Sequence, residues 1–226
     1  MNRYARVTGK LPREVLLLKG RGCFHKKCLF CDYHLDACED PFADNSRVLG
    51  EVTGEFGIVD IINSGSVHEL DPQTLRYIKE IADEKNVGVL WFEAHYAYRS
   101  RLDEIRREFP NQTVKFRTGI ESFHDGFRRA MNKGIPDVSP EEVRGYFEGV
   151  CLLVGVEGQT KEAVRRDIRV AARLFEYFSV NVFCPNTTPV KRDDSLVRWF
   201  LQDVYPRAKR LANCEILLDN TDLGVG

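Results

Sequence analysis

The sequence lacks the features that mark several classes of protein. Its 226 residues carry no excess of either charge, because 33 Lys and Arg residues stand against 34 Asp and Glu residues. Proteins that bind nucleic acid normally show a basic excess, so we expect no direct contact with nucleic acid. No run approaches the roughly 20 apolar residues of a membrane span, and the first residues lack the apolar core of a signal peptide. We therefore expect a cytoplasmic protein without a membrane partner.

The pattern of cysteines argues against a disulfide framework. The chain has seven cysteines, an odd number, and no export signal, which favours metal or thiol chemistry. It also has no internal repeat, no low-complexity tract and no linker rich in proline, glycine and serine. We therefore expect a single domain over residues 1–226, which at this length buries roughly 70% of the surface of the unfolded chain.

Apolar runs rich in β-branched residues alternate with segments of helical periodicity. The runs predict buried strands at residues 15–18, 58–62, 87–92, 113–116, 150–154, 180–183 and 215–218. The periodic segments predict helices at residues 72–83, 98–108, 162–175 and 196–211. Strands that alternate with helices form right-handed βαβ units and a parallel sheet. Because a complete eight-fold barrel needs about 250 residues, the sequence predicts an α/β fold with an open, partial (β/α)6 TIM-like barrel; the alternative is a doubly wound sheet.

Three cysteines follow the first expected strand, at the end of the sheet where both folds bind ligands. Cys23, Cys28 and Cys31 lie within nine residues, whereas the other four cysteines are scattered. Thiolates so placed can surround one metal centre, and soft sulfur ligands select zinc, copper(I) or iron–sulfur clusters. A nearby side chain could complete a tetrahedral zinc site, the candidates being His34, His25 and Asp32. The residues alone therefore leave zinc and an iron–sulfur cluster open.

The cysteine loop resembles the cluster loop of the radical S-adenosylmethionine (SAM) enzymes. The pattern of that family is Cys-x3-Cys-x2-Cys, with an aromatic residue just before the last cysteine. Phe30 matches the aromatic residue, whereas the first interval here has four residues, a known kind of departure in the superfamily. The resemblance implies a [4Fe–4S] cluster held by Cys23, Cys28 and Cys31, with one iron left open for SAM.

Three further segments match this family in the right order. Residues 63–66 stand where the family has a glycine-rich segment that meets the amino group of SAM. Residues 119–122, followed by 131–135, resemble the stretch in which polar groups at a strand end hold SAM. Residues 153–160 resemble the strand and turn that flank the adenine. The SAM-binding residues that the resemblance implies are Phe30, Ser64, Gly65, Ser66, Glu121 and Val156.

The chemistry of this family explains why a barrel suits it. In the mechanism that the resemblance implies, an electron delivered to the cluster cleaves SAM and gives a 5′-deoxyadenosyl radical. Because this radical abstracts hydrogen from almost any nearby C–H bond, a mostly closed lumen has to exclude solvent and hold the target bond in contact. Lys26 and Lys27 most simply belong to a solvated loop, although basic charge there could assist an acidic electron donor such as flavodoxin or ferredoxin.

The compact chain and its four-residue cysteine interval resemble one subgroup, the small bacterial queuine lyases. Residues 31–36, 91–95 and 181–188 carry the rest of that resemblance. Those salvage enzymes cleave the C–N bond of queuine and release 7-aminomethyl-7-deazaguanine, which can re-enter tRNA modification. The resemblance therefore implies queuine or a related deazapurine as substrate, with hydrogen abstraction from its cyclopentenediol ring followed by loss of the amine.

A deazaguanine base and a secondary ammonium both present N–H donors, so they need carboxylate or amide acceptors. Polar side chains near the expected strand ends and beside the cysteine loop are our candidates for substrate binding: Asp32, Tyr33, Glu93, His95, Arg117, Asn181 and Asn186. Glu93 and His95 are also the expected catalytic residues, although a surface ion pair and a packed histidine are their ordinary alternatives. Two other functions stay open, a radical SAM activase that makes a glycyl radical on a partner protein and a zinc-binding structural module.

Overall fold

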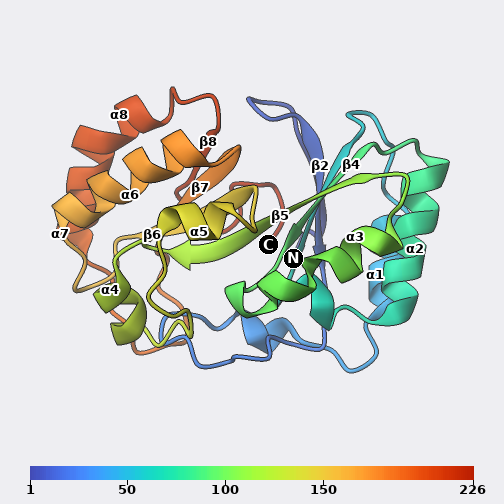
Figure 1. Ribbon diagram of the computed structural model, residues 1–226, viewed down its shortest axis with the longest axis horizontal. Helices are drawn as coiled ribbons and strands as arrows, with labels where there is room; N and C mark the ends of the chain where they lie inside the picture. The colour runs from blue at the N-terminus through green and yellow to red at the C-terminus, as the bar shows by residue number, and fades with distance from the viewer. The chain divides into compact units, whose positions relative to one another are not determined.

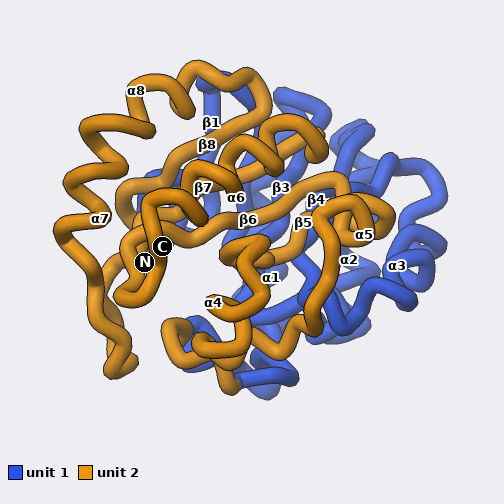
Figure 2. The backbone as a smooth tube through the Cα atoms, turned by 60° about the vertical axis from the view of Figure 1, so that its left-hand side comes forward, with its two compact units in different colours: residues 1–26, 33–116, 221–226 blue, residues 27–32, 117–220 orange.

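The computed structural model describes residues 1–226 and consists of two compact units. The first unit contains residues 1–26, 33–116 and 221–226, and the second contains residues 27–32 and 117–220 (Figure 2). The cysteine loop therefore contributes to both: Cys23 belongs to the first unit, and Cys28 and Cys31 belong to the second. The single domain expected over residues 1–226 stays a prediction.

The first unit is built on four consecutive strands, β1 (Tyr4–Val7), β2 (Arg13–Leu18), β3 (Ile58–Asn63) and β4 (Val89–Glu93). β1 pairs with β2 in the antiparallel sense, whereas β2 with β3 and β3 with β4 pair in parallel. In β2, Val15, Leu16 and Leu18 are fully buried. An almost continuous apolar run of this kind is typical of a strand covered on both faces. The structure thus adds β1, whose mixed sequence gave no apolar run.

Helices connect the parallel strands of the first unit (Figure 1). They are η1 (Tyr33–Asp36), α1 (Phe42–Leu49), η2 (Val67–Glu69), α2 (Pro72–Glu84), η3 (Tyr96–Arg101) and α3 (Leu102–Glu108). α2 begins where the carboxylate of Asp71 accepts the backbone N–H of Thr74 at 2.9 Å, with Pro72 in the first turn. The single helix expected at residues 98–108 is instead η3 followed by α3, because the backbone of Arg101, at φ −113°, leaves the α-helical conformation between them.

The second unit continues with four parallel strands, β5 (Thr113–Glu121), β6 (Gly149–Val154), β7 (Tyr177–Val182) and β8 (Cys214–Leu217). The first four residues of β5 belong to the first unit. β5 runs five residues beyond the strand expected at residues 113–116 and ends at Glu121. The strands follow one another in chain order, as expected for consecutive βαβ units.

The helices of the second unit are α4 (Asp125–Ala130), α5 (Pro140–Arg144), α6 (Lys161–Leu174), α7 (Asp194–Trp199), η4 (Phe200–Val204) and α8 (Tyr205–Ala208). The helix expected at residues 196–211 is therefore three segments, of which η4 is π-helical. Pro206 in the first turn of α8 has no N–H to donate, so the α-helical bonding pattern cannot continue through it. None of the helices in the structure combines the length and the apolar character needed to cross a bilayer.

Candidate active site

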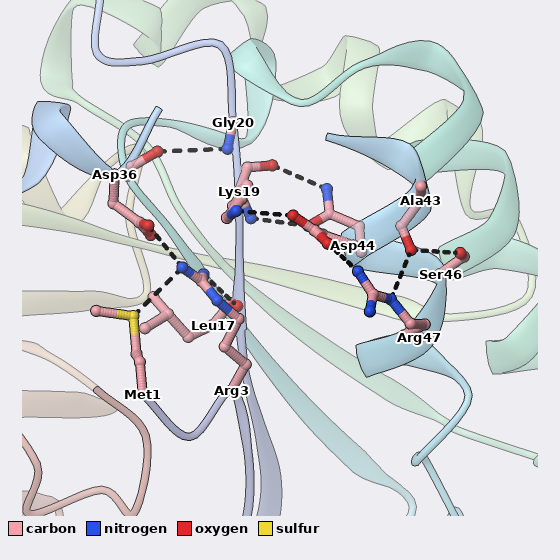
Figure 3. Close-up of polar contacts among 12 residues, drawn as sticks. Met1, Arg3, Leu17, Lys19, Gly20, Asp36, Ala43, Asp44, Ser46 and Arg47 are labelled. Atoms are coloured by element: carbon pink, nitrogen blue, oxygen red, sulfur yellow. Dashed lines mark hydrogen bonds and ion pairs between the residues drawn. The ribbon is translucent and has the colours of Figure 1, made fainter. Parts of the chain in front are cut away.

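Side chains of the first unit fix the root of the cysteine loop, where β2 ends (Figure 3). Buried Asn45 on α1 accepts the backbone N–H of Lys19 and donates to the Lys19 carbonyl, both at 2.8 Å. Arg3, just before β1, donates to the carbonyl of Leu17 at 3.1 Å and to the carboxylate of Asp36 at 2.5 Å. These contacts set the direction in which the chain leaves β2 and the place where η1 ends.

Cys23 packs closely against the segment that follows β3. A Cβ added to Gly65 would lie 3.0 Å from the Cα of Cys23 and 3.1 Å from its nitrogen, so only glycine lets the two backbones approach this far. The hydroxyl of Ser64 accepts a backbone N–H at the root of the loop at 3.3 Å, and the hydroxyl of Ser66 accepts the backbone N–H of His95 at 2.9 Å. Residues 64–66 therefore hold the start of the cysteine loop and the end of β4.

Glu69 ties these segments together, and we did not expect it from the sequence. Its carboxylate accepts the backbone N–H of Phe24 at 2.8 Å, the hydroxyl of Tyr98 at 3.2 Å and, more closely, the backbone N–H of Ser66. Burial, together with the nearby Glu69 carboxylate, raises the pKa of Tyr98 to about 12, so the phenol remains a donor. The Ser-x-x-Glu pattern of Ser66 and Glu69, which forms a capping box at η2, is the signal that could have identified this residue.

The two expected catalytic residues lie at the carboxyl end of β4. Glu93 is the last residue of the strand and is partly buried. The ring of His95 stacks on His25, with centroids 5.5 Å apart, and meets the edge of Phe24 at 5.3 Å. Its Nδ1 accepts the backbone N–H of Ala97 at 3.2 Å, so the neutral ring carries its proton on Nε2. His95 can therefore donate a hydrogen bond from Nε2.

In the second unit, Cys28 and Cys31 lie beside an apolar cluster that contains Phe30 and Val156. Phe30 is 8% exposed and Val156 is fully buried. Further members of this cluster and its margin are Phe127, Phe183, Met131, Leu153 and Val190. The structure thus brings together the two side chains expected beside the adenine of SAM and places two of the three loop cysteines against them.

Glu121 ends β5 in an uncommon conformation and is paired with a buried lysine. Its φ of 63° lies in the left-handed region, and the pairing with β6 shifts register between Gly119 and Glu121. Nζ of Lys133 donates to Oε1 of Glu121 at 2.8 Å, and each side chain is 11% exposed. Burial alone lowers the pKa of Lys133, but the Glu121 carboxylate and the thiols of Cys28 and Cys31 raise it above its ordinary value. Lys133 therefore stays cationic beside two cysteines.

These surroundings fit an iron–sulfur cluster. Cysteine binds metal as the thiolate, and a neighbouring cation favours that form, which is what Lys133 supplies to Cys28 and Cys31. No three or more histidine, cysteine and acidic side chains are grouped to hold a single metal ion. A [4Fe–4S] cluster makes a different demand, because each cysteine binds a different iron atom.

Two residues expected to bind substrate also tie residues 27–32 to the loop after β7. The amide of Asn186 donates to the carbonyl of Phe30 at 2.8 Å and accepts the backbone N–H of Thr188 at 3.0 Å. The carboxylate of Asp32 accepts the backbone N–H of Thr187 at 3.0 Å and its hydroxyl at 2.9 Å. Asn186 and Asp32 therefore position Phe30 and the cysteines on either side of it.

The remaining expected substrate residues lie in different places. Asn181 is the fifth residue of β7, and its buried Oδ1 has no hydrogen-bond partner, an arrangement that suits a ligand donor. Arg117 lies in the middle of β5 with its guanidinium 5.5 Å from the ring of Tyr177, not at a carboxyl end, because the strand continues to Glu121. Tyr33 opens η1 and is 61% exposed.

The solved structure of a queuine lyase from Clostridium spiroforme bound to SAM and queuine is similar to the whole chain. The TM-score is 0.96 and the sequence identity is 38%, over 100% of this chain and 99% of that chain. The cobalamin-dependent SAM radical enzyme OxsB, solved with aqua-cobalamin and SAM, is a far weaker likeness, with a TM-score of 0.45, 13% identity, and coverage of 84% of this chain and 30% of that chain. No protein-family model and no curated protein matches the sequence.

Proposed function

Because this chain belongs to the queuine lyase family of radical SAM enzymes, we propose that it cleaves the C–N bond of queuine and releases 7-aminomethyl-7-deazaguanine. The observation that carries the proposal is the identity of 38% over the full chain with a queuine lyase bound to SAM and queuine. Membership of this family confirms the expected partial (β/α)6 barrel and the expected cofactors, a [4Fe–4S] cluster and SAM.

Cys23, Cys28 and Cys31 are the proposed ligands of the cluster. When bound, the cluster supplies the electron that cleaves SAM to the 5′-deoxyadenosyl radical, which takes a hydrogen from the substrate. Lys133 supports binding by keeping a positive charge beside the thiols of Cys28 and Cys31. Glu69 supports it by fixing the peptide that follows Cys23, through its hydrogen bond from the N–H of Phe24.

The proposed SAM contacts fall into three groups. Residues 64–66 offer a segment that needs no side chain at Gly65 and can approach the amino group of SAM through its backbone. Glu121 offers a carboxylate for the ammonium or the ribose diol, and its pairing with Lys133 holds the side chain in one place. Phe30 and Val156 offer the apolar surface on which the adenine can pack.

Glu93, His95 and Asn181 are the proposed residues for queuine. A carboxylate at Glu93 can pair with two N–H donors of the deazaguanine edge. The unsatisfied Oδ1 of Asn181 can accept one more donor of the substrate. Neutral His95, with its proton on Nε2, can donate a hydrogen bond to the leaving amine. These roles depend on the position of the three residues at or near the carboxyl ends of β4 and β7.

The reaction can be tested directly under anaerobic conditions. Reconstituted protein, dithionite, SAM and queuine should give 7-aminomethyl-7-deazaguanine and 5′-deoxyadenosine, both measured by mass spectrometry. SAM cleavage at the same slow rate with and without queuine, without the aminomethyl product, would contradict the proposal.

Three variants separate the proposed roles. Glu93→Ala should raise the KM for queuine by orders of magnitude and leave the visible spectrum of the cluster intact, because a buried charged hydrogen bond is worth roughly 2–5 kcal/mol. Cys23→Ala should lose the cluster, whereas Cys38→Ala, which removes a thiol outside the proposed ligands, should retain it. The reverse pattern for the two cysteines would overturn the ligand assignment.

A further inference from the structure

Asp167 is a buried carboxylate on α6 for which the proposed reaction has no use. It is 4% exposed. Its Oδ2 accepts the hydroxyl of Ser122 at 2.5 Å, and its Oδ1 accepts the backbone N–H of Phe123 at 3.1 Å. The same Ser122 oxygen accepts the backbone N–H of His124 at 3.0 Å. One carboxylate therefore fixes three consecutive residues directly after Glu121.

The chain needs such support at this point because β5 leaves its regular pairing there. The register with β6 shifts between Gly119 and Glu121, and the backbone N–H of Ser122 turns back to the carbonyl of Ile120 at 2.7 Å. Glu121 itself has a φ of 63°, a conformation that a residue with a side chain keeps only when its surroundings enforce it. Arg128 holds the carbonyl of Ser122 at 2.9 Å, so Asp167 supplies the contacts to the hydroxyl and to the next N–H.

Stability of the fold does not account for a carboxylate at this position. Burial raises the pKa of Asp167 to about 6, although Ser122, the N–H of Phe123, Arg166 and His124 all act in the opposite direction. Folding therefore costs more with an ionised Asp167 at neutral pH than it would with a neutral residue, because the charged form is better solvated in the unfolded chain. In return, the carboxylate accepts two hydrogen bonds in fixed directions, one from the hydroxyl of Ser122 and one from the N–H of Phe123.

We propose that Asp167 is a positioning residue, which holds Glu121 in the left-handed conformation that aims its carboxylate at Lys133 and so sets the geometry of the SAM site. This inference rests on the proposed role of Glu121 in SAM binding. The strand end carries the functional carboxylate, and the helix behind it carries the side chain that fixes the strand end.

The test is SAM affinity, measured by calorimetry on the reconstituted holoenzyme. Asp167→Ala should weaken SAM binding at least tenfold, which corresponds to about 1.4 kcal/mol. Asp167→Asn should weaken SAM binding less than Asp167→Ala, because its amide oxygen can still accept the N–H of Phe123, although it offers one acceptor where the carboxylate offers two. Val164→Ala is the matched control: Val164 is also buried on α6 at 4% exposure, and its apolar side chain makes no hydrogen bond to the strand end. Iron content should be the same in all of these proteins.

Three results would overturn the proposal. The first is a folded Asp167→Ala protein that binds SAM as tightly as the wild type. The second is a Val164→Ala protein that loses as much SAM affinity as Asp167→Ala, which would indicate a general loss of packing around α6. The third is an Asp167→Asn protein that loses as much SAM affinity as Asp167→Ala, which would indicate that the charge of the side chain matters and its hydrogen bonds do not. Should Asp167→Ala fail to fold, Ser122→Ala replaces it and should weaken SAM binding several-fold, with an unchanged affinity refuting the proposal. Glu121→Ala tests the premise that Glu121 binds SAM, because normal SAM binding in that variant would refute this role. The measurement does not involve queuine cleavage, so its outcome is independent of the proposed reaction.

Discussion

Gly65→Ala should displace the cysteine loop, because the added methyl group has no space. Its carbon would lie 2.2 Å from Oε2 of Glu69, and 3.0 Å from the Cα of Cys23. The Glu69 carboxylate cannot move aside without releasing the backbone N–H groups of Phe24 and Ser66. The contact on the other side is backbone, which has no rotamer to change.

The cost of this substitution follows from those contacts. Forcing a methyl group into a packed site costs about 1–3 kcal/mol. Releasing the partly buried N–H of Ser66 adds about 1–3 kcal/mol. The smallest structural response is to move the start of the loop away from Gly65. The packed position of Cys23 would then be destabilised by about 3 kcal/mol or more, which lowers the equilibrium constant for packing over one hundredfold.

The assay is iron and sulfide per chain after anaerobic reconstitution, followed by calorimetry with SAM. Gly65→Ala should retain much less iron than the wild type and show no measurable SAM binding. Gly9→Ala is the matched control, because no atom lies within 4 Å of a Cβ added at Gly9. Gly65→Ala protein with a full complement of iron and wild-type SAM affinity would refute the steric reasoning.

Other substitutions test the charges and the contacts of the second unit. Because the pKa of Asp167 is about 6 in the folded protein and 3.8 in the unfolded chain, the folded state binds the proton more tightly, and stability should fall by roughly 3 kcal/mol as the pH rises from 4 to 6 and stay level above that. Asp167→Asn should remove this fall in urea unfolding of the cluster-free protein, and pH curves that run parallel would contradict the assignment. Lys133→Met should lose iron to a chelator several-fold faster than the wild type, because it removes the cation beside two thiols. It also leaves a buried carboxylate unpaired, which costs about 3–5 kcal/mol. An equal rate of iron loss would exclude a role of the Lys133 charge in holding the cluster. Asn186→Ala gives up the hydrogen bond to Phe30, worth about 1 kcal/mol, and should raise the KM for SAM several-fold with no change in the KM for queuine. A change confined to the KM for queuine would contradict this positioning role and support Asn186 as a substrate residue.

The fold could be predicted where burial leaves a mark on the sequence. Strands β2 to β8 all overlap expected apolar runs, because a parallel strand is covered on both faces. β1 was missed because its four residues form no apolar run and none of them is fully buried. The expected helix at residues 196–211 is interrupted by η4 and Pro206, a local choice that apolar periodicity does not report.

Some features of the candidate site could likewise be predicted from the sequence, and others could not. The spacing of Cys23, Cys28 and Cys31 is local and therefore visible in the sequence. The pairing of Glu121 with Lys133 spans a turn and a helix, and no periodic pattern encodes it. Asn186 was identified as a polar residue near a strand end, but its amide is used by the chain itself, and sequence alone does not show which acceptors a side chain meets.

The attachment of residues 27–32 to the second unit also bears on when the cofactor can be inserted. Lys27 is hydrogen-bonded to a residue 105 positions later in the chain. Phe30 is hydrogen-bonded to a residue 156 positions later, and Asp32 to one 155 positions later. A ribosome that adds about 5–20 residues per second needs roughly 8–30 s to make the partner of Phe30 after Phe30 itself. Throughout that interval Cys28 and Cys31 lack the contacts that position them, so the cluster site is complete only after residues 186–187 have been made, and a chain that stops before β7 should mature without its cluster.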